Sequence, residues 1–418
     1  MREMKDSGIE WIGEIPKDWE VHPVYAYFEE GKTKNYRMQE QNLLSLSYGK
    51  IIRKDINTNG GLLPASFNTY NVIEAGDIII RPTDLQNDKR SLRTGLVKEQ
   101  GIITSAYIDL RPKDNVNSKY YHYLLHSYDI IKVFYNMGNG VRQGLNFSEF
   151  AKLLLLDPSK VQQQQIADFL DTKCSEIDAT AEDIQKEISL LEDYKKSVIT
   201  EAVTKGLNPD AEMKDSKIFY LGQINKTWNL TKVGYCCKKL YRPFEPSDEA
   251  LVCSNKGKVV PRGDTLIGLM TSDDNAMQGI CKGDIAIHGM DTWHGAIACS
   301  EYDGKITRVV HVCKADGDNR FVVYWLQHLA FVGVYKLISN GVRGNTSDFR
   351  SWDKVADIYV PNPIKEEQQQ IADYLDSKCS EIDTLIADKK RQLDILADYK
   401  KSIIYEYVTG KKEVPVNE

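Results

Sequence analysis

The feature that most constrains the fold is a long segment that occurs twice in this chain of 418 residues. Residues 163–204 and 368–409 align without a gap, and about 25 of 42 positions are identical. Weaker matches keep the same order along the chain, such as Gly49-Lys-Ile-Ile52 with Gly257-Lys-Val-Val260. An offset near 200 residues is far too long for a solenoid, whose repeats span about 20–50 residues. We therefore expect one two-part unit present twice, each copy a variable block followed by a constant block.

The constant blocks are predicted to be long helices. No Pro or Gly occurs between residues 162 and 204, and apolar residues recur at alternating steps of four and three, which is the heptad pattern of a coiled coil. Gly206 and Gly410 follow as helix stops, and about 40 residues would make each helix roughly 60 Å long. One apolar seam per helix requires one partner, and the simplest partner is the other helix. The predicted seam positions are Leu170, Cys174, Ile177, Ile184, Ile188 and Leu191 in the first helix, and Leu375, Cys379, Ile382, Ile386, Leu393 and Leu396 in the second.

The variable blocks are predicted to be of the α+β class. Short β-like runs, such as residues 77–81 and 102–109, are bounded by Gly, Asn or Asp. Each block also contains one aromatic-rich helical segment. The predicted domains are residues 1–157 and 207–361 for the two variable blocks, 158–206 and 362–412 for the two helices, and 413–418 for a tail.

The net charge of −6 belongs to the helices. Residues 1–155 hold 20 basic and 19 acidic side chains, and residues 206–360 hold 19 and 18. The helical segments 156–205 and 361–418 hold 6 against 11 and 9 against 12. A nucleic-acid partner needs a local positive face and not a positive total, so the charge does not exclude one.

Several function classes lack their motifs. There is no apolar run of about 20 residues and no apolar stretch behind the charged N-terminus, so we expect a cytoplasmic protein. The eight cysteines contain no C-x-x-C, which favours free thiols over a zinc site. No G-x-G-x-x-G, G-x-S-x-G or H-E-x-x-H motif occurs. We therefore expect no catalytic residue, no resident metal and no cofactor on this chain.

Two groups of histidines have side chains that could bind a metal. His288, Asp291 and His294 lie close together in sequence, but such residues in a loop are more often surface polar groups. His122 and His126, four residues apart on an aromatic helix, are more often packing residues than ligands.

Four short motifs together carry a family resemblance. They are Trp11-Ile-Gly-Glu-Ile-Pro-Lys-Asp-Trp19, Gly-Asp-Ile at 76–78 and 283–285, Gly-Val-Arg at 140–142 and 341–343, and Gln-Gln-Gln-Ile-Ala at the start of both helices. The chain resembles, over essentially its whole length, the specificity subunit of type I restriction–modification systems. One departure is Tyr220-Leu-Gly-Gln-Ile224, which lacks the Trp and Pro found at the first copy.

The resemblance implies a pseudo-twofold, non-catalytic DNA-binding subunit. Each variable block would be a target recognition domain that reads one half of a bipartite site in double-stranded DNA. The two helices would pack antiparallel, set the spacer and dock two modification subunits. Those subunits would methylate adenine N6 with S-adenosylmethionine, and restriction subunits that join the complex would use ATP and Mg²⁺. The chain would not bind a membrane.

Base edges and phosphates are contacted by basic and polar side chains in loops. Because Arg142 and Arg343 occur in both blocks, which would read different bases, they are expected to contact phosphate or to support structure. The candidate DNA-binding residues are Lys50, Arg53, Lys54, Arg81, Asn87, Lys89, Arg90, Arg93 and Arg142 in the first block, and Lys256, Lys258, Arg262, His288, Asp291, Trp293, His294 and Arg343 in the second. The alternative is a coiled-coil scaffold whose two heads bind a ligand other than DNA, and a steep loss of affinity with salt would discriminate against it.

Overall fold

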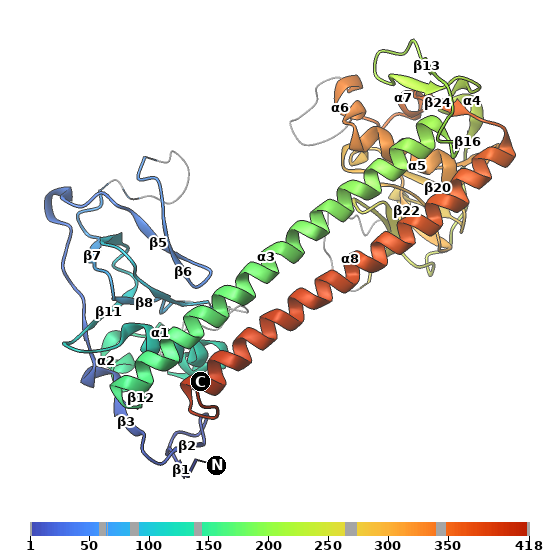
Figure 1. The fold of residues 1–418 in the computed structure, drawn as a ribbon. Helices are drawn as coiled ribbons and strands as arrows, with labels where there is room; N and C mark the ends of the chain where they lie inside the picture. Colours follow the sequence, from blue (N-terminus) through green and yellow to red (C-terminus); the bar gives the residue numbers. More distant parts are fainter. Residues whose placement is uncertain are drawn as a thin grey trace. The chain divides into compact units, whose positions relative to one another are not determined.

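The computed structural model describes residues 2–57, 64, 66–83, 92–137, 144–263, 274–339 and 348–415. The chain forms two compact units, Met1–Ile184 together with Arg391–Glu418 (unit 1) and Gln185–Lys390 (unit 2). Both units mix helices and sheets (Figure 1). Among the described residues no helix combines the length and the apolar character needed to span a membrane.

Unit 1 is built around a four-stranded antiparallel sheet in the order β4-β11-β8-β9. Helix α1 packs on one face of this sheet, where Tyr120 and Leu124 are buried with Ile78 and Ile108. Two hairpin-like pairs, β5–β6 and β7–β10, cover the other face. The element bounds are β1 Met4–Asp6, β2 Glu14–Pro16, β3 Glu20–Pro23, β4 Phe28–Glu30, β5 Leu44–Ser47, β6 Lys50–Arg53, β7 Asn71–Ile73, β8 Ile78–Ile80, β9 Thr94–Leu96, β10 Gly101–Ile103, β11 Ile108–Pro112, α1 Ser118–Ile130, α2 Phe147–Phe150 and β12 Leu154–Asp157.

Unit 2 repeats this plan. Its sheet has the order β16-β23-β20-β21, helix α5 buries Phe321 and Trp325 against one face, and the β17–β18 hairpin lies on the other. The element bounds are β13 Met213–Asp215, β14 Gln223–Asn225, β15 Asn229–Lys232, α4 Val233–Cys236, β16 Cys237–Lys239, β17 Leu251–Ser254, β18 Lys258–Pro261, β19 Met277–Ile280, β20 Ile285–His288, β21 Ile297–Cys299, β22 Gly304–Thr307, β23 Val310–Ala315, α5 Asn319–Phe331, α6 Val334–Ile338, α7 Trp352–Ala356 and β24 Tyr359–Asn362.

The two constant blocks are single helices, α3 Lys160–Lys205 and α8 Lys365–Val408. The start of α3 has a reciprocal capping box. The backbone N–H of Gln162 donates to Ser159 Oγ at 3.3 Å, and the backbone N–H of Ser159 donates to Gln162 Oε1 at 3.0 Å. Gly206 follows α3 with φ +90°, a conformation that side-chain-bearing residues rarely adopt and that commonly ends helices. The predicted helices and their stop signals are confirmed.

The two helices pack antiparallel within each unit. In unit 1, Leu170 near the start of α3 shares a buried cluster with Ile403 and Tyr407 near the end of α8. In unit 2, the end of α3 packs with the start of α8, where Val203 and Leu375 share a cluster. The predicted seam residues are buried at Leu170, Cys174, Ile177, Ile184, Ile188, Leu375, Cys379, Ile382 and Ile386, and half-buried at Leu191, Leu393 and Leu396. The α+β class with a helix pair is therefore confirmed.

Lysines occupy several seam positions and each reaches an acidic partner on the other helix. Lys195 Nζ lies 2.6 Å from Asp383 Oδ1, and the equivalent Lys400 Nζ lies 2.6 Å from Asp178 Oδ1. Lys389, which interrupts the apolar pattern of α8, pairs with Glu187. A polar residue in a coiled-coil seam costs stability but restricts the register, so these ion pairs favour one alignment of the helices.

Candidate nucleic-acid interface

Two hairpins, with the residue that follows each, carry half of the described candidate residues. In unit 1, β5 and β6 pair from Leu44↔Arg53 to Ser47↔Lys50. The turn residues Tyr48 and Gly49 have φ +48° and +77°, as a two-residue hairpin turn with right-handed strand twist requires. Tyr48 is 68% exposed at this tip. The β5–β6 hairpin therefore forms a short protrusion on the face of the sheet opposite α1.

The basic residues of the β5–β6 hairpin differ in availability. Lys50, Arg53 and Lys54 are all exposed. Arg53 already pairs with Glu99, with Arg53 Nε 2.6 Å from Glu99 Oε1, and this hydrogen bond lowers the pKa of the Glu99 carboxyl. Arg53 would have to exchange a carboxylate for a phosphate or base, whereas Lys50 at the tip has no ion pair with any described residue.

The two described arginines beside the sheet have opposite environments. Arg81 is exposed directly after β8. Arg93 is only 3% exposed, and its guanidinium donates to the backbone carbonyls of Arg81 and Thr83. In this conformation the Arg93 guanidinium holds the segment after β8, and its expected contact with DNA stays a prediction.

The matching hairpin of unit 2 is β17–β18, which pairs Ser254 with Lys258 around the loop Asn255-Lys256-Gly257. Lys256 and Lys258 are exposed and Arg262 is half-buried. The Gly-Lys matches seen in the sequence thus lie in corresponding hairpins whose tips differ in length and side chains. Corresponding positions with different side chains are what two readers of different DNA sequences would need.

The loop after β20 brings two histidines toward one carboxylate. His288 Nδ1 lies 3.2 Å from Asp291 Oδ2, and His294 Nδ1 lies 4.0 Å from Asp291 Oδ1. Burial lowers the pKa of His288, and its Nδ1 accepts from the backbone amides of Met290 and Asp291. His288 therefore acts as a support for the loop, while His294 is half-exposed.

Trp293 in the same loop is half-buried and packs against the core below α5. The Lys336 ammonium lies 6.0 Å from its ring centroid, a distance at which a cation is attracted to the ring face. The expected residues Asn87, Lys89, Arg90, Arg142 and Arg343 lie outside the described residues.

The histidines of α1 are packing residues. Burial lowers the pKa of His122 to about 3 and that of His126 to about 4, so both rings are neutral at physiological pH. Their rings stack with centroids 6.2 Å apart.

A cleft that sequence reasoning missed lies in unit 2. It has a volume of about 640 Å³ and is lined by Lys239, Tyr241, Arg242, Phe244 and Arg308, among others. Lys239 Nζ lies 5.1 Å from the Tyr241 ring centroid. Alternation of basic and aromatic residues is typical of surfaces that bind nucleic acids, and the run 238–244 carries that signal in the sequence.

The Gly-Asp-Ile motif supports structure in both units. The motif carboxylates are buried, and each accepts from a backbone amide of its own turn: Asp77 from Glu74 at 2.8 Å, and Asp284 from Cys281 at 2.9 Å. Each also binds an arginine, Arg111 at 3.2 Å and Arg242 at 2.8 Å respectively. The Gly-Asp-Ile motif recurs because the turn before each strand needs a carboxylate that accepts a hydrogen bond from the backbone of that turn.

Asp109 forms a second buried carboxyl beside Asp77. Burial is the main cause that raises its pKa to about 8, and the neighbouring Asp77 adds to it. The Cβ that a side chain would add at Gly31 would lie within 2 Å of the Asp109 carboxylate, so glycine is required there. Arg111 Nη2 lies 3.2 Å from the Asp77 carboxylate and 3.9 Å from that of Asp109, so one guanidinium faces both carboxyl groups.

Comparison with known proteins agrees with this architecture. Residues 27–190 match the type I restriction modification DNA specificity domain. A protein of Methanocaldococcus jannaschii assigned as the specificity subunit of the type I restriction enzyme MjaX is 25% identical over 435 residues, which cover 96% of both chains.

Two solved structures share the fold at 14% identity. One, from work on the assembly and conformational transition of a type I restriction–modification system, has a TM-score of 0.68 and matches 95% of this chain and 99% of its own. The other is the HsdS subunit from Thermoanaerobacter tengcongensis, with a TM-score of 0.50 over 97% of this chain and all of its own. The duplicated α+β plan and the paired helices agree with these similarities: residues 27–190 resemble the type I restriction modification DNA specificity domain, and nearly the whole chain shares its fold with the two solved structures.

Proposed function

We propose that the two variable blocks, residues 1–157 and 207–361, are target recognition domains that each read one half of a bipartite sequence in double-stranded DNA. The observation that carries this proposal is the pair of corresponding hairpins, β5–β6 and β17–β18, with basic but different tips. Phosphate contacts would come from exposed lysines such as Lys50 and Lys258, and specificity from residues that differ between the tips. Because it would act on chromosomal DNA, we place the protein in the cytoplasm.

The remaining proposed segments are helical connectors and a tail. Residues 158–206 and 362–412 would fix the gap between the half-sites, because the repeated segments within them, 163–204 and 368–409, align without a gap. Residues 413–418 would be a tail.

Two equivalent apolar patches on the helices are candidate docking sites for two modification subunits. Leu190 and Tyr194 on α3 are 69% and 56% exposed, and their counterparts Ile395 and Tyr399 on α8 are 61% and 52% exposed. Residues four apart share a helix face. Large apolar side chains kept exposed in both copies of a repeat indicate a surface that is covered in the working complex.

The modification subunits would carry S-adenosylmethionine and methylate adenine N6. Restriction subunits, where they join, would use ATP and Mg²⁺. These cofactors would be bound by the partner subunits and not by this chain.

The docking proposal is tested by stoichiometry. Replacing Leu190 and Tyr194 with Asp should reduce the number of bound modification subunits from two to one, as native mass spectrometry would count them. The control is Val161→Asp, since Val161 is 67% exposed on the same helix but Glu366 stands at the matching position of α8. Two subunits still bound to the double variant would contradict the assignment.

The function itself is tested by the adenine methylation pattern of the source genome with the gene intact and deleted. Loss of one bipartite methylated motif upon deletion is the expected result. Exchange of residues 1–157 for another recognition domain should then change one half of that motif. Alteration of both halves would contradict independent recognition by the two blocks.

The alternative proposal is a scaffold whose two heads bind a ligand other than DNA, and the near-neutral charge of both blocks is the observation that favours it. Affinity of the reconstituted complex for DNA should fall steeply with salt if phosphates are contacted. An affinity for DNA that does not change with salt concentration would favour the scaffold.

A further inference from the structure

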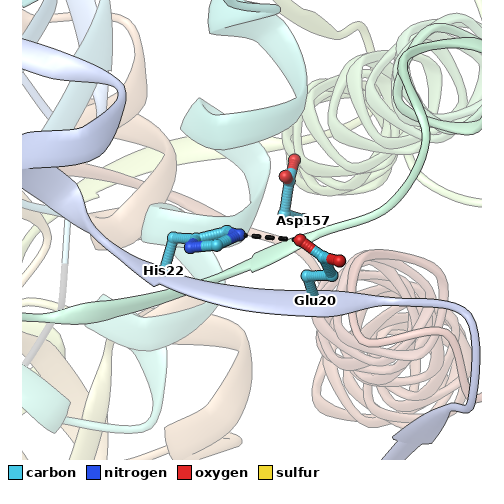
Figure 2. Close-up of side chains that lie close together, drawn as sticks. All are labelled: Glu20, His22 and Asp157. Carbon is cyan, nitrogen blue, oxygen red and sulfur yellow. Dashed lines mark hydrogen bonds and ion pairs between the residues drawn. The ribbon is translucent and has the colours of Figure 1, made fainter.

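One group of side chains that the proposed function does not use has the chemistry of a metal site. Among the described residues, Glu20, His22 and Asp157 form the group of three in which the potential ligand atoms all lie within 4.8 Å of one another. Figure 2 shows the His22 ring directed at the Glu20 carboxylate, with Asp157 beside them on the neighbouring strand. We propose that these three residues bind a divalent transition-metal ion of the Zn²⁺ type.

Strand register brings the three ligands together. Strands β3 and β12 are antiparallel, and Glu20 lies directly opposite Asp157. His22 is two residues beyond Glu20 and therefore on the same face of the ribbon. His22 Nε2 lies 3.0 Å from Glu20 Oε2. All three side chains can thus reach one ion without a change in the backbone.

The distances fit a four-coordinate ion after small side-chain movements. Zn²⁺ binds nitrogen and oxygen at about 2.0–2.2 Å, which separates tetrahedral ligand atoms by roughly 3.4 Å. The potential ligand atoms lie within 4.8 Å of one another, and side-chain rotations would have to bring them to that separation around the ion. A water molecule would complete a set of one imidazole and two carboxylates.

Outer hydrogen bonds hold the innermost ligand. Asp157 Oδ1 accepts from the Tyr121 hydroxyl at 3.0 Å and from Gln163 Nε2 at 2.9 Å. The His22 ring packs edge-on against Tyr27, with centroids 6.1 Å apart. Metal ligands are commonly oriented by such neighbours, and the two donors to Asp157 come from α1 and α3.

Unit 2 supplies an internal comparison. Its strands β15 and β24 keep the register, with Asn229 opposite Asn362, and Gln368 Nε2 again donates to the side chain of residue 362, at 3.2 Å. The three ligand positions hold Asn229, Thr231 and Asn362. The shared fold therefore does not require an imidazole and two carboxylates there, and their presence in unit 1 alone points to a local purpose.

A bound cation would fasten β3 to the strand that leads directly into α3. Asp157 ends β12, and α3 begins at Lys160. The site is independent of the proposed function, because it would be present whether the heads bind DNA or another ligand.

The test is metal binding by the full-length chain after removal of metals with a chelator. Titration with Zn²⁺ followed by calorimetry should show one equivalent bound, and Co²⁺ should give the visible absorption of nitrogen and oxygen ligands without a thiolate charge-transfer band. The variant Glu20→Asn/His22→Thr/Asp157→Asn, which copies unit 2, should lose this equivalent while its circular dichroism spectrum stays unchanged.

A second variant, designed to gain a metal site in unit 2, excludes a folding defect as the reason for lost binding. Asn229→Glu/Thr231→His/Asn362→Asp should raise the stoichiometry from one to two equivalents. The proposal is overturned if the parent chain binds no Zn²⁺ at micromolar concentrations, or if the first variant binds as much as the parent. A thiolate band that persists in that variant would likewise assign the ion to cysteines and overturn the site.

Discussion

Replacement of Lys50 with Ala should weaken DNA binding in a way that depends on salt and not on sequence. Lys50 is exposed at the tip of the β5–β6 hairpin and has no ion pair with a described residue, so its ammonium can meet a phosphate without giving up a partner. Arg53 at the base of the same strand must first release Glu99. We therefore expect a larger loss from Lys50→Ala than from Arg53→Ala.

The magnitude follows from counterion release. Each phosphate contact with duplex DNA contributes about 0.9 to the slope of log affinity against log salt concentration. One lost contact should lower the steepness by about that amount. Between 50 and 200 mM salt, the ratio of parent to variant affinity should then shrink about 3.5-fold.

The assay is equilibrium binding of the reconstituted complex to its own site and to an unrelated duplex, measured across that salt range. Lys17→Ala is the matched control, since Lys17 is an exposed lysine of the same unit that pairs with Glu3, and it should leave the slope unchanged. A Lys50→Ala slope equal to that of the parent would refute the placement of DNA at this hairpin. A change confined to one sequence would show that Lys50 reads bases.

Three further predictions test the stability of the fold and the role of the helices as a spacer. Leu170→Ala and Leu375→Ala, which truncate equivalent side chains that are fully buried, should each lower the free energy of unfolding by about 2–5 kcal/mol in urea titrations, and losses below 1 kcal/mol would contradict tight packing of the helices. Asp109→Asn should become more stable relative to the parent as the pH rises from 5 to 8. Burial raises the pKa of Asp109 in the folded state to about 8, compared with 3.8 in the unfolded chain. The stability of the parent is therefore complete below pH 3.8 and falls as the pH approaches 8, because the buried carboxyl then loses its proton. Parallel unfolding curves at both pH values would refute this. Deletion of one heptad from both α3 and α8 should change the spacer of the methylated motif, and an unchanged spacer with retained activity would separate helix length from spacing.

Much of the fold was predictable because its signals are local. The heptad steps from Leu170 to Leu191 lie within one helix, and each step reports which side of that helix is buried. The repeat carried the same information into the second half of the chain. Glycine at 206 and 410 marked the helix ends because a positive φ is needed there.

The interface was less predictable from the sequence. The sequence showed the match of Gly49-Lys-Ile-Ile52 with Gly257-Lys-Val-Val260, and the structure places these segments in corresponding hairpins. The burial of Arg93 was not predictable, because a basic residue in a charged run looks the same whether its guanidinium meets solvent or backbone carbonyls. The same holds for His288, whose role in its loop depends on which amides face its ring.

The sequence by itself determined the duplicated plan, the two long helices and the α+β class, because duplication and periodicity are properties of residue order. Only the tertiary structure decided which side chains meet. Glu20 and Asp157 are opposite each other because β3 pairs with β12 in one register, and a shift of one residue would turn these side chains to the other face. Contacts between residues so far apart in the chain depend on that register, which no local pattern in the sequence records.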